Sequence, residues 1–321
     1  MAASSSAAPV LLRILSASVS VVNRAGRIIK DVMRKGDLGI IDKGIDDLQT
    51  EADRSVQHCI VTSLSRQFPK ISIIGEEELD SEGKVLDEWI VTSLDSDVLA
   101  KKCPENLASI PEEKVVVWVD PLDGTSEYTQ GLLDHVTVLV GIAVNGKAIG
   151  GVIHQPYYNY QRTRENYHVE KDVYKQGRTL WGMNGIGVFG IEKKAPCEGK
   201  RIITTTRSHS NKNVNLTIDA MKPDEVLRVG GAGHKVLLLI EGRAHAYVFA
   251  SKGCKKWDTC APEALLHILG GKLTDMHGNS LEYHKDIQYL NSGGVLATYD
   301  AAVHEWYRER VPEEVKKTLP P

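Results

Sequence analysis

Apolar residues recur at helical spacing in two stretches near the start of the chain. In the first stretch, residues 9–35, apolar side chains stand at positions 11, 15, 19, 22 and 29. This spacing predicts one amphipathic helix, which Gly36 would end. The second stretch begins near Thr50 and carries apolar side chains at positions 52, 56, 59, 60 and 64. We expect this helix to stop before Pro69, because the residue that precedes a proline avoids the helical conformation.

Short apolar runs follow these helices and predict strands. Residues 71–74 form one such run, and residues 115–119, Val-Val-Val-Trp-Val, form the clearest, which is typical of a buried strand. Two more runs, residues 136–143 and 148–153, flank the dipeptide Asn145-Gly146. An Asn-Gly pair favours the tight turn of an antiparallel hairpin, so we expect these two runs to pair.

The second half of the chain alternates strands and helices. Apolar runs and helical spacing predict strands at residues 201–205, 226–229 and 244–250 and helices at residues 211–221, 233–242 and 261–269. Interleaved helices and strands indicate an α/β fold, a layered α+β sandwich whose sheets are mixed because of the hairpin. Residues 156–177 have no periodicity and are typical of a connection near a domain boundary. We expect two α/β domains, residues 1–160 and 161–321.

The composition agrees with such a protein and argues against two kinds of partner. The 321 residues include 39 basic and 42 acidic side chains, a formal net charge of −3. A protein that coats nucleic acid usually has a clearly basic domain, so we expect no nucleic-acid partner. No apolar run approaches the roughly 18 residues that a membrane span requires, so we expect no membrane partner either.

The five cysteines are scattered and include no Cys-x-x-Cys pair. This is typical of reduced thiols in a cytoplasmic protein rather than of a disulfide framework or a zinc site. The first helix has an alternative interpretation. Its basic residues alternate with serines before the first acidic residue, Asp31, which is the composition of a mitochondrial transit peptide. The helical apolar spacing favours a structural helix.

Two aspartates stand where the clearest strand ends. Residues 115–119 run directly into Asp120-Pro-Leu-Asp123-Gly124-Thr125. The two carboxylates can hold a hard cation, and the backbone amides at the start of a following helix can hold an anion. Metal and phosphate are therefore the ligand pair that this corner would accept. The alternative is a tight turn with a helix cap, which the same residues fit.

Acidic residues also stand at two other corners of the predicted fold. Glu76 and two more glutamates follow Gly75, and Asp258 precedes the helix predicted at residues 261–269. Each corner has an ordinary explanation, a solvated acidic turn for the glutamates and an N-cap for Asp258, with Pro262 in the first turn. These explanations leave open why three separate corners present acids beside buried apolar runs.

Together, the sequence motifs at these corners resemble those of the inositol monophosphatase superfamily of magnesium-dependent, lithium-sensitive phosphatases. The resemblance covers nearly the whole chain and rests on the order of its motifs, which are Asp47-Leu-Gln-Thr-x-Ala-Asp53, Gly75-Glu-Glu77, Asp120-Pro-Leu-Asp-Gly-Thr125, Thr204-Thr-Thr-Arg-Ser-His-Ser210, Val229-Gly-Gly-Ala-Gly-His-Lys235 and Cys254-Lys-Lys-Trp-Asp258-x-x-Ala261. Within the superfamily, Ser126-Glu127-Tyr128 resembles the bisphosphate nucleotidases, whereas inositol monophosphatases usually have Thr-Asn-Phe there.

The resemblance implies a metal site and a pair of residues that activates water. Two or three magnesium ions would be bound by four carboxylates and one carbonyl, those of Glu76, Asp120, Asp123, Asp258 and Leu122. Asp53 and Thr125 would activate water, because a threonine hydroxyl that is hydrogen-bonded to a carboxylate can accept a proton. The Gly124 and Thr125 amides would bind the phosphate. The resemblance also implies that lithium would inhibit the phosphatase activity.

The resemblance also implies the substrate. It assigns substrate contacts to Thr206, His209, Gly231 and Lys235, with Ser208 close by. Lys235 and His209 offer charge to a second phosphate, and Gly231 lets a ring approach the backbone. Each of these residues also fits an ordinary loop or helix start. We expect a monomer that hydrolyses the 3′-phosphate of adenosine 3′,5′-bisphosphate (PAP) and also accepts PAPS and inositol 1,4-bisphosphate.

Two alternatives to this activity stay open, an inositol polyphosphate 1-phosphatase and a catalytically silent phosphate-sensing protein. Two segments depart from the pattern of close relatives, namely a long charged connection at residues 157–177 and Glu51 where a lysine is expected. The net charge hides an uneven distribution. Residues 76–97 carry a local charge of −8 and residues 200–256 a local charge of +7. Much of this charge fits a solvated surface, and the distribution also fits a metal-binding first half and a nucleotide-binding second half.

Overall fold

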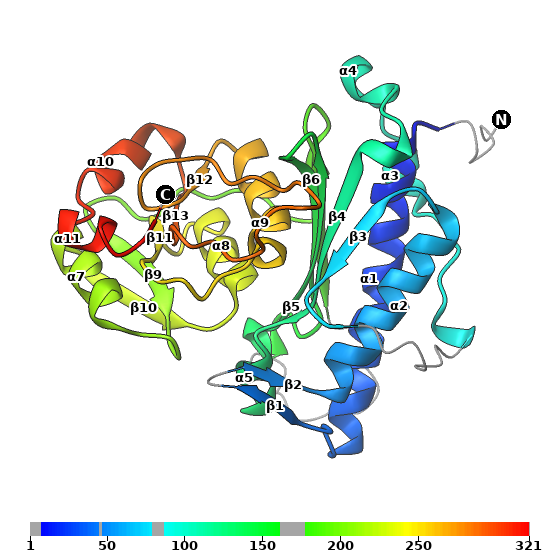
Figure 1. The fold of residues 1–321 in the computed structure, drawn as a ribbon, viewed down its shortest axis with the longest axis horizontal. Coiled ribbons are helices and arrows are strands. Elements are labelled where there is room, and N and C mark those ends of the chain that lie inside the picture. The colour runs from blue at the N-terminus through cyan, green and yellow to red at the C-terminus, as the bar shows by residue number, and fades with distance from the viewer. Residues whose placement is uncertain (1–7, 45–46, 79–86, 161–176, 321) are drawn as a thin grey trace.

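The computed structural model describes residues 8–44, 47–78, 87–160 and 177–320, which form alternating layers of helices and sheets (Figure 1). Helices α1 (Val10–Lys35) and α2 (Glu51–Gln67) cover one face of a six-stranded sheet. Between this sheet and a five-stranded sheet lie α8 (Ala232–Ile240) and α9 (Lys256–Ile268). The expected layered α/β fold with mixed sheets is confirmed.

Helix α1 forms where the apolar spacing predicted it. It ends at Gly36, whose φ of 82° lies in the left-handed region that glycine adopts without steric cost. Apolar side chains such as Leu11, Leu15 and Val22 are fully buried in the core that α1 shares with α2 and the six-stranded sheet. The basic, serine-rich segment is thus a structural helix. Among the described residues, no helix is both long and apolar enough to cross a membrane.

The six-stranded sheet contains the predicted hairpin. Its strands follow the order β3 (Ser72–Gly75), β4 (Val115–Asp123), β5 (Thr137–Val144), β6 (Lys147–Gln155), β7 (Arg178–Met183) and β8 (Gly187–Phe189). Strands β3 and β4 are parallel and the other neighbours are antiparallel. Val144 pairs with Lys147 across the Asn-Gly turn, as predicted. Strand β4 is longer than predicted, because its pairing continues past an irregularity to Asp123.

Strands β7 and β8 are absent from the sequence-based prediction and bear on the domain boundary. They extend the first sheet to Phe189, beyond the expected boundary at residues 160 and 161. That boundary stays a prediction, and we propose to place it instead between Phe189 and Ile202, where the next sheet begins. Most of the unusual connection at residues 157–177 lies outside the described residues.

The five-stranded sheet follows the order β10 (Glu225–Val229), β9 (Ile202–Thr206), β11 (Ala246–Phe249), β13 (Val295–Thr298) and β12 (Lys272–Thr274). Strands β9, β10 and β11 match predicted strands and are parallel, whereas β12 and β13 were not predicted. On the far side of this sheet lie α7 (Lys212–Met221), α10 (His304–Arg308) and α11 (Glu313–Lys316) (Figure 1).

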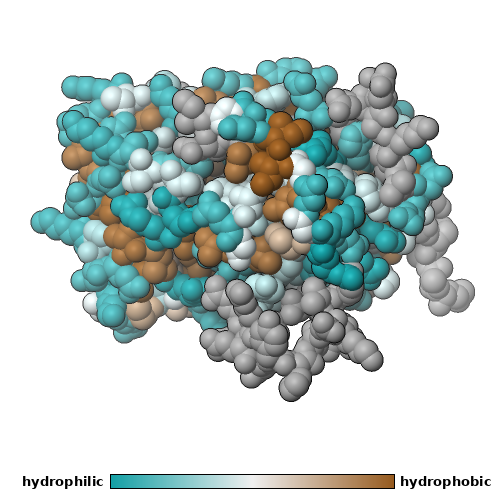
Figure 2. All heavy atoms as spheres, turned by 90° about the horizontal axis from the view of Figure 1, so that it is seen from below, coloured by the Kyte–Doolittle hydropathy of each residue, from teal (hydrophilic) through white to brown (hydrophobic). Residues whose placement is uncertain are grey.

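Short elements complete the described chain. Helices α3 (Ser96–Leu99) and α4 (Glu105–Ala108) lie in the long connection before β4. Helix α5 (Thr125–Thr129) follows the end of β4 after one residue. Strands β1 (Ile41–Gly44) and β2 (Asp47–Gln49) pair as a small separate sheet. Figure 2, viewed from the side where α5, β1 and β2 lie in Figure 1, shows a mostly hydrophilic face with separate apolar clusters.

Candidate active site

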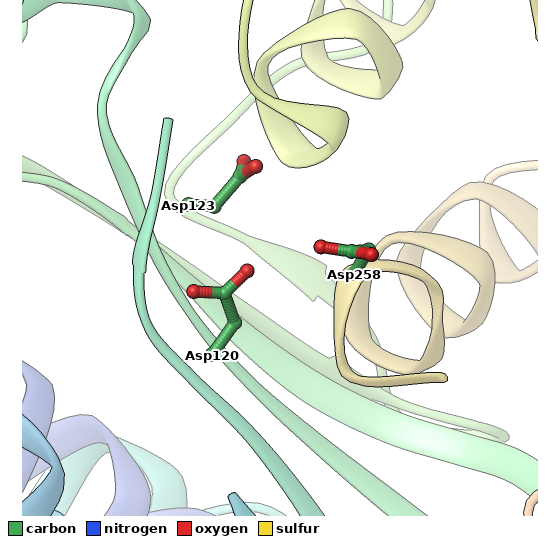
Figure 3. A group of neighbouring side chains, drawn as sticks. All are labelled: Asp120, Asp123 and Asp258. Atoms are coloured by element: carbon green, nitrogen blue, oxygen red, sulfur yellow. The ribbon is translucent and has the colours of Figure 1, made fainter. Parts of the chain in front are cut away.

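Three aspartates from two distant parts of the chain meet between the two sheets. Asp120 and Asp123 come from the end of β4, and Asp258 comes from the first turn of α9 (Figure 3). Each offers a carboxylate oxygen, and these oxygens all lie within 4.8 Å of one another. Asp120 and Asp123 are buried, and Asp258 is partly exposed. The structure thus brings together three of the four predicted metal-binding carboxylates in one group.

Asp258 takes a different position in its helix from the one predicted. Helix α9 begins at Lys256 rather than at Ala261, so Asp258 is its third residue and not its N-cap. Its carboxylate accepts the backbone N–H of Lys255 at 2.5 Å, as in a capping box. Pro262 lies inside the helix rather than in its first turn. The prediction was wrong because proline favours first turns, whereas here the helix continues through it.

Glu76 stands at the same edge of the sheet as Asp120. Strands β3 and β4 are parallel, so their ends coincide, and the Glu76 N–H donates to the Val119 carbonyl at 3.1 Å. Glu76 is not among the three grouped carboxylates, yet it faces the charge of Asp258. The next residue, Glu77, has a separate role. It is buried and accepts hydrogen bonds from Lys43 and Gln49.

Burial governs the protonation of these acids. It raises the pKa of Asp120 well above its ordinary value, and the charges of Glu76, Asp123 and Asp258 raise it further. The pKa of Asp123 rises to about 6, again chiefly through burial and then through the charge of Asp258. Burial also raises the pKa of Glu76 and of Asp258. A buried set of carboxylates that repel one another fits a bound divalent cation, which would neutralise them.

Asp53 and Thr125 form a hydrogen-bonded pair beside this group. The Thr125 hydroxyl lies 3.0 Å from Oδ1 of Asp53 and 3.1 Å from the Leu122 carbonyl. Asp53 is fully buried in the first turn of α2, where its Oδ2 accepts the Thr50 N–H at 2.7 Å in a capping box. Burial raises the pKa of Asp53 to about 6, and hydrogen bonds from Thr50 and Thr125 offset part of the rise.

One pocket of about 320 Å³ connects the acids to the predicted substrate residues, which is a size typical of small-ligand sites. The predicted metal and phosphate residues that line it, here called the acidic side, are Glu76, Asp123, Gly124, Thr125 and Asp258. The predicted substrate residues that line it, here called the substrate side or basic side, are Thr206, Ser208, His209, Gly231 and Lys235. The other predicted residues, Asp53, Asp120 and Leu122, are buried behind these lining residues. Gly124 has a φ of 93°, which places the start of α5 at Thr125.

The substrate side of the pocket is internally hydrogen-bonded. The His209 N–H donates to the Thr206 hydroxyl at 3.0 Å, and the Ser208 hydroxyl lies 2.8 Å from Nδ1 of His209. Lys235 is buried in α8, and its ammonium group donates to the Gly231 carbonyl at 3.0 Å. Burial lowers the pKa of Lys235, while the charge of Asp123 raises it.

Asp123 joins the two sides of the pocket. Its carboxylate accepts the backbone N–H groups of Ala232 and Gly233 at 2.7 and 2.8 Å and the Thr137 hydroxyl at 2.6 Å. The first two donors belong to the first turn of α8. The negative carboxylate therefore stabilises the N-terminus of the helix that carries Lys235.

Several pocket residues were missed by sequence reasoning. Glu127, Tyr247, Phe249 and Cys254 also line the pocket. Glu127 stood inside a quoted motif, but nothing in the sequence indicated that its carboxylate would be buried. Glu51, the unusual residue before Asp53, forms an exposed ion pair with Lys35 at 3.0 Å. It does not line the pocket.

Comparisons with known proteins agree with this geometry. Residues 11–316 match the inositol monophosphatase family. The chain belongs to this family. Among its family relatives, the human protein named 3′(2′),5′-bisphosphate nucleotidase 1 is 56% identical over 313 residues, which cover 97% of this chain and 98% of the relative. The Dictyostelium discoideum protein of the same name is 41% identical and covers 90% of this chain and 93% of the relative.

Solved structures of more distant proteins share the fold of this inositol monophosphatase family member. The extragenic suppressor protein suhB from Bartonella henselae superposes with a TM-score of 0.65 at 19% identity, over 94% of this chain and 98% of that one. CysQ from Bacteroides thetaiotaomicron, a bacterial member of the family, gives a TM-score of 0.61 at 20% identity, over 88% and 95%. The family is metal-dependent, and the group of Asp120, Asp123 and Asp258 is its candidate metal site in this chain.

Proposed function

We propose that this chain is a 3′(2′),5′-bisphosphate nucleotidase that hydrolyses the 3′-phosphate of PAP to give AMP and phosphate. One observation carries the proposal, namely that a single pocket joins the acidic group to Lys235 and His209. A substrate with two phosphates could place one at the acids and the other at the basic side. The 56% identity to the human nucleotidase supports the same choice of substrate.

The acidic side of the pocket fits magnesium, a hard cation that prefers oxygen ligands. We assign the carboxylates of Glu76, Asp120, Asp123 and Asp258 and the Leu122 carbonyl as ligands of two or three ions. The support is the close approach of the three grouped aspartates and the pKa values of the four acids, which burial raises. When bound, magnesium lowers the pKa of water and neutralises charge on a phosphate.

Thr125 and Asp53 are assigned to proton transfer. The Thr125 hydroxyl would accept a proton from the attacking water as it gives its own to Asp53, 3.0 Å away. The raised pKa of Asp53, about 6, suits a proton acceptor that works near neutral pH. The amides of Gly124 and Thr125 are assigned to the phosphate oxygens, because amides in the first turn of a helix have no partner within the helix.

The substrate side would hold the rest of the nucleotide. We assign Lys235 and His209 to the second phosphate, and Thr206 and Ser208 to hydrogen bonds with the sugar or phosphate. We assign Gly231 to the approach of the substrate ring to the backbone. A side chain at this position would lie 2.7 Å from the His135 carbonyl oxygen, so the packing of the protein itself requires glycine there. PAPS (3′-phosphoadenosine 5′-phosphosulfate) carries a phosphate and a phosphosulfate, and inositol 1,4-bisphosphate carries two phosphates. Each thus has a second anionic group for the basic residues, and we expect both to be accepted.

Turnover of PAP against inositol 1,4-bisphosphate tests the proposal. In the presence of magnesium, we expect a higher kcat/KM for PAP. A strong preference for inositol 1,4-bisphosphate would instead indicate an inositol polyphosphate 1-phosphatase. Release of no phosphate from either compound would indicate a phosphate-sensing protein without catalysis.

Lithium provides a second test, since a small monovalent cation can replace one weakly held magnesium. We expect submillimolar to millimolar lithium to inhibit phosphate release, and sodium at equal concentration serves as the ionic-strength control. Unchanged turnover in lithium would contradict the proposed metal arrangement.

We also propose that the enzyme acts as a monomer in the cytoplasm. The five cysteines are free thiols, and four of them are buried, as in a protein of a reducing compartment. Size-exclusion chromatography with light scattering tests the monomer, for which a mass near 35.4 kDa is expected. A mass twice as large would contradict it.

A further inference from the structure

Glu127 is a buried carboxylate at the edge of the pocket that the proposed reaction does not use. It is the third residue of α5, two positions after the Thr125 that contacts Asp53, and only 2% of its surface is exposed. An acid beside a pocket for phosphate esters opposes anion binding unless its charge is neutralised. The carboxylate therefore needs a partner, and its role follows from that partner.

Arg207 is that partner. Its Nη2 and Nε both donate to Oε1 of Glu127, at 3.0 and 3.2 Å, and Nη2 also donates to the Gln130 side chain at 2.8 Å. Arg207 follows the last residue of β9, Thr206, and precedes Ser208 and His209. The ion pair thus connects α5, on the acidic side of the pocket, to residues 206–209, which we call the substrate loop.

The packing around Glu127 fixes its carboxylate in place. A Cβ atom at Gly230 would overlap the Glu127 carboxyl group, so a side chain at this position would displace that carboxyl group. Oε2 of Glu127 lies 3.7 Å from the position that a Cβ of Gly124 would take. The Glu127 carboxylate therefore lies between the start of α5 and the glycine turn that precedes α8.

Within the described part of the chain, few other hydrogen bonds link the substrate loop to the acidic side. The His209 N–H donates to Thr206, Ser208 and His209 contact each other, and Arg228 of β10 donates to the Thr206 carbonyl, but none of these bonds reaches α5. The pair of Arg207 and Glu127 supplies that link through a charge-assisted bond to a buried acceptor.

We propose that the Glu127–Arg207 ion pair is a positioning element that holds the substrate loop at a fixed distance from α5 and so sets recognition of the nucleotide part of the substrate. The inference rests on the proposed function. It assigns no chemical step to either residue. It implies that loss of the ion pair weakens binding of a bisphosphate substrate. Hydrolysis of a small phosphate monoester that does not reach the substrate loop should change less.

Kinetics with two substrates test the inference. PAP reaches the substrate loop in our assignment, whereas p-nitrophenyl phosphate has one phosphate and no nucleotide. For Glu127→Gln and Arg207→Gln we expect the ratio of kcat/KM for PAP to that for p-nitrophenyl phosphate to fall by roughly 10-fold or more, as for loss of a charge-assisted hydrogen bond. Most of the change should lie in KM for PAP.

The double variant Glu127→Gln/Arg207→Gln shows whether Glu127 and Arg207 act as one ion pair or through two independent contacts. We expect it to lower the ratio no more than the worse single variant, because each single variant already breaks the same link. A matched control is Glu241→Gln, which breaks the partly buried ion pair of Arg178 and Glu241 away from the pocket. Its substrate ratio should equal that of the wild type.

Hydrogen exchange adds a readout that is independent of catalysis. We expect faster exchange in peptides covering residues 203–212 of Glu127→Gln than in the wild type, with unchanged exchange in α1. An unchanged substrate ratio and unchanged exchange in a folded Glu127→Gln would overturn the inference. So would a far larger loss in Arg207→Gln than in Glu127→Gln, since Arg207 would then contact the substrate itself. If the wild type did not cleave PAP, the proposed function would fail, while the exchange result would still decide the link.

Discussion

The Thr125 hydroxyl lies 3.0 Å from the Asp53 carboxylate, although 72 positions separate the two residues. Each of the two residues is positioned by its own helix. Thr50 caps α2 and fixes Asp53 through its N–H and hydroxyl groups, and Gly124 starts α5 at Thr125. The contact joins the helix layer to the end of β4, next to the three grouped aspartates.

Substitutions of this pair should abolish turnover without unfolding the protein. We expect Thr125→Ala and Asp53→Asn each to lower kcat for PAP by about 100-fold or more, the scale of general-base catalysis. Because the two residues pass one proton, the double variant should lose no more than the worse single variant. Steady-state kinetics at saturating PAP measure the effect.

Thr125→Ser is the matched control, because it keeps the hydroxyl and removes only a methyl group. We expect it to retain most of the wild-type kcat. A double variant whose loss equals the product of the two single losses would show that Asp53 and Thr125 act separately.

The parts of the site that sequence reasoning could locate are those in which chemistry and strand pattern coincide. A continuous β-branched run before Asp120 predicted a buried strand, and its end had to place Asp120 and Asp123 at a sheet edge. The start of α2 near Thr50 could also be located from the sequence, and the structure shows that Thr50 and Asp53 form a capping box there. Local rules were sufficient for these features.

Other parts depend on contacts that no local pattern records. Strand β13 is an interior strand of the second sheet, between β11 and β12, yet its four residues have too few positions for a periodic signal. The start of α9 was placed five residues late, because Pro262 reads as a first-turn residue. The burial of Glu127 depends on Arg207, 80 residues away, and on the missing side chain of Gly230. Tertiary packing decides such features.

Lys235 offers a test of the basic side of the pocket. The Lys235→Gln variant keeps much of the side-chain length but removes the charge, so we expect KM for PAP to rise roughly 10- to 100-fold, the effect of losing a hydrogen bond to a charged group. The kcat should change much less, since Lys235 does not contact Asp53 or Thr125 in this structure.

Lys200→Gln is the matched control for this test. Lys200 is exposed and does not line the pocket, so its substitution removes one positive charge without touching the site. An equal rise in KM for both variants would indicate an effect of net charge alone. That result would contradict a direct role of Lys235.

The stability of the metal-free protein tests the raised pKa of the buried acids without an activity assay. Burial raises the pKa of Asp120, so its stabilising contribution is fully present below the unfolded pKa, about 3.9, and is lost as pH rises through the native pKa. Asp120→Asn removes this titration. In a chelator at pH 7.5 we expect the variant to be more stable than the wild type by about 1 kcal/mol or more, as measured by urea unfolding.

The pH dependence of this difference is the critical measurement. We expect the advantage of Asp120→Asn to shrink as pH falls and to become small near pH 3, below the unfolded pKa of about 3.9, where the aspartate is mostly protonated in both states. Taking the difference between two proteins cancels the buried histidines His154 and His304, whose lowered pKa values destabilise both proteins at acidic pH. A constant difference from pH 4 to 7.5 would contradict the assignment.

Magnesium should reverse the order of these two proteins. A ligand that binds only the folded state stabilises it by about 2.7 kcal/mol at a concentration one hundred times its Kd. At pH 7.5 we expect magnesium to raise the Tm of the wild type by several degrees and that of Asp120→Asn much less, because the variant lacks one of three carboxylates whose oxygens lie within 4.8 Å of one another. The exposed Glu51→Gln variant, which keeps all three, should respond like the wild type. Equal shifts in all three proteins would mean that magnesium binds elsewhere, since the only charge removed at the proposed site is that of Asp120.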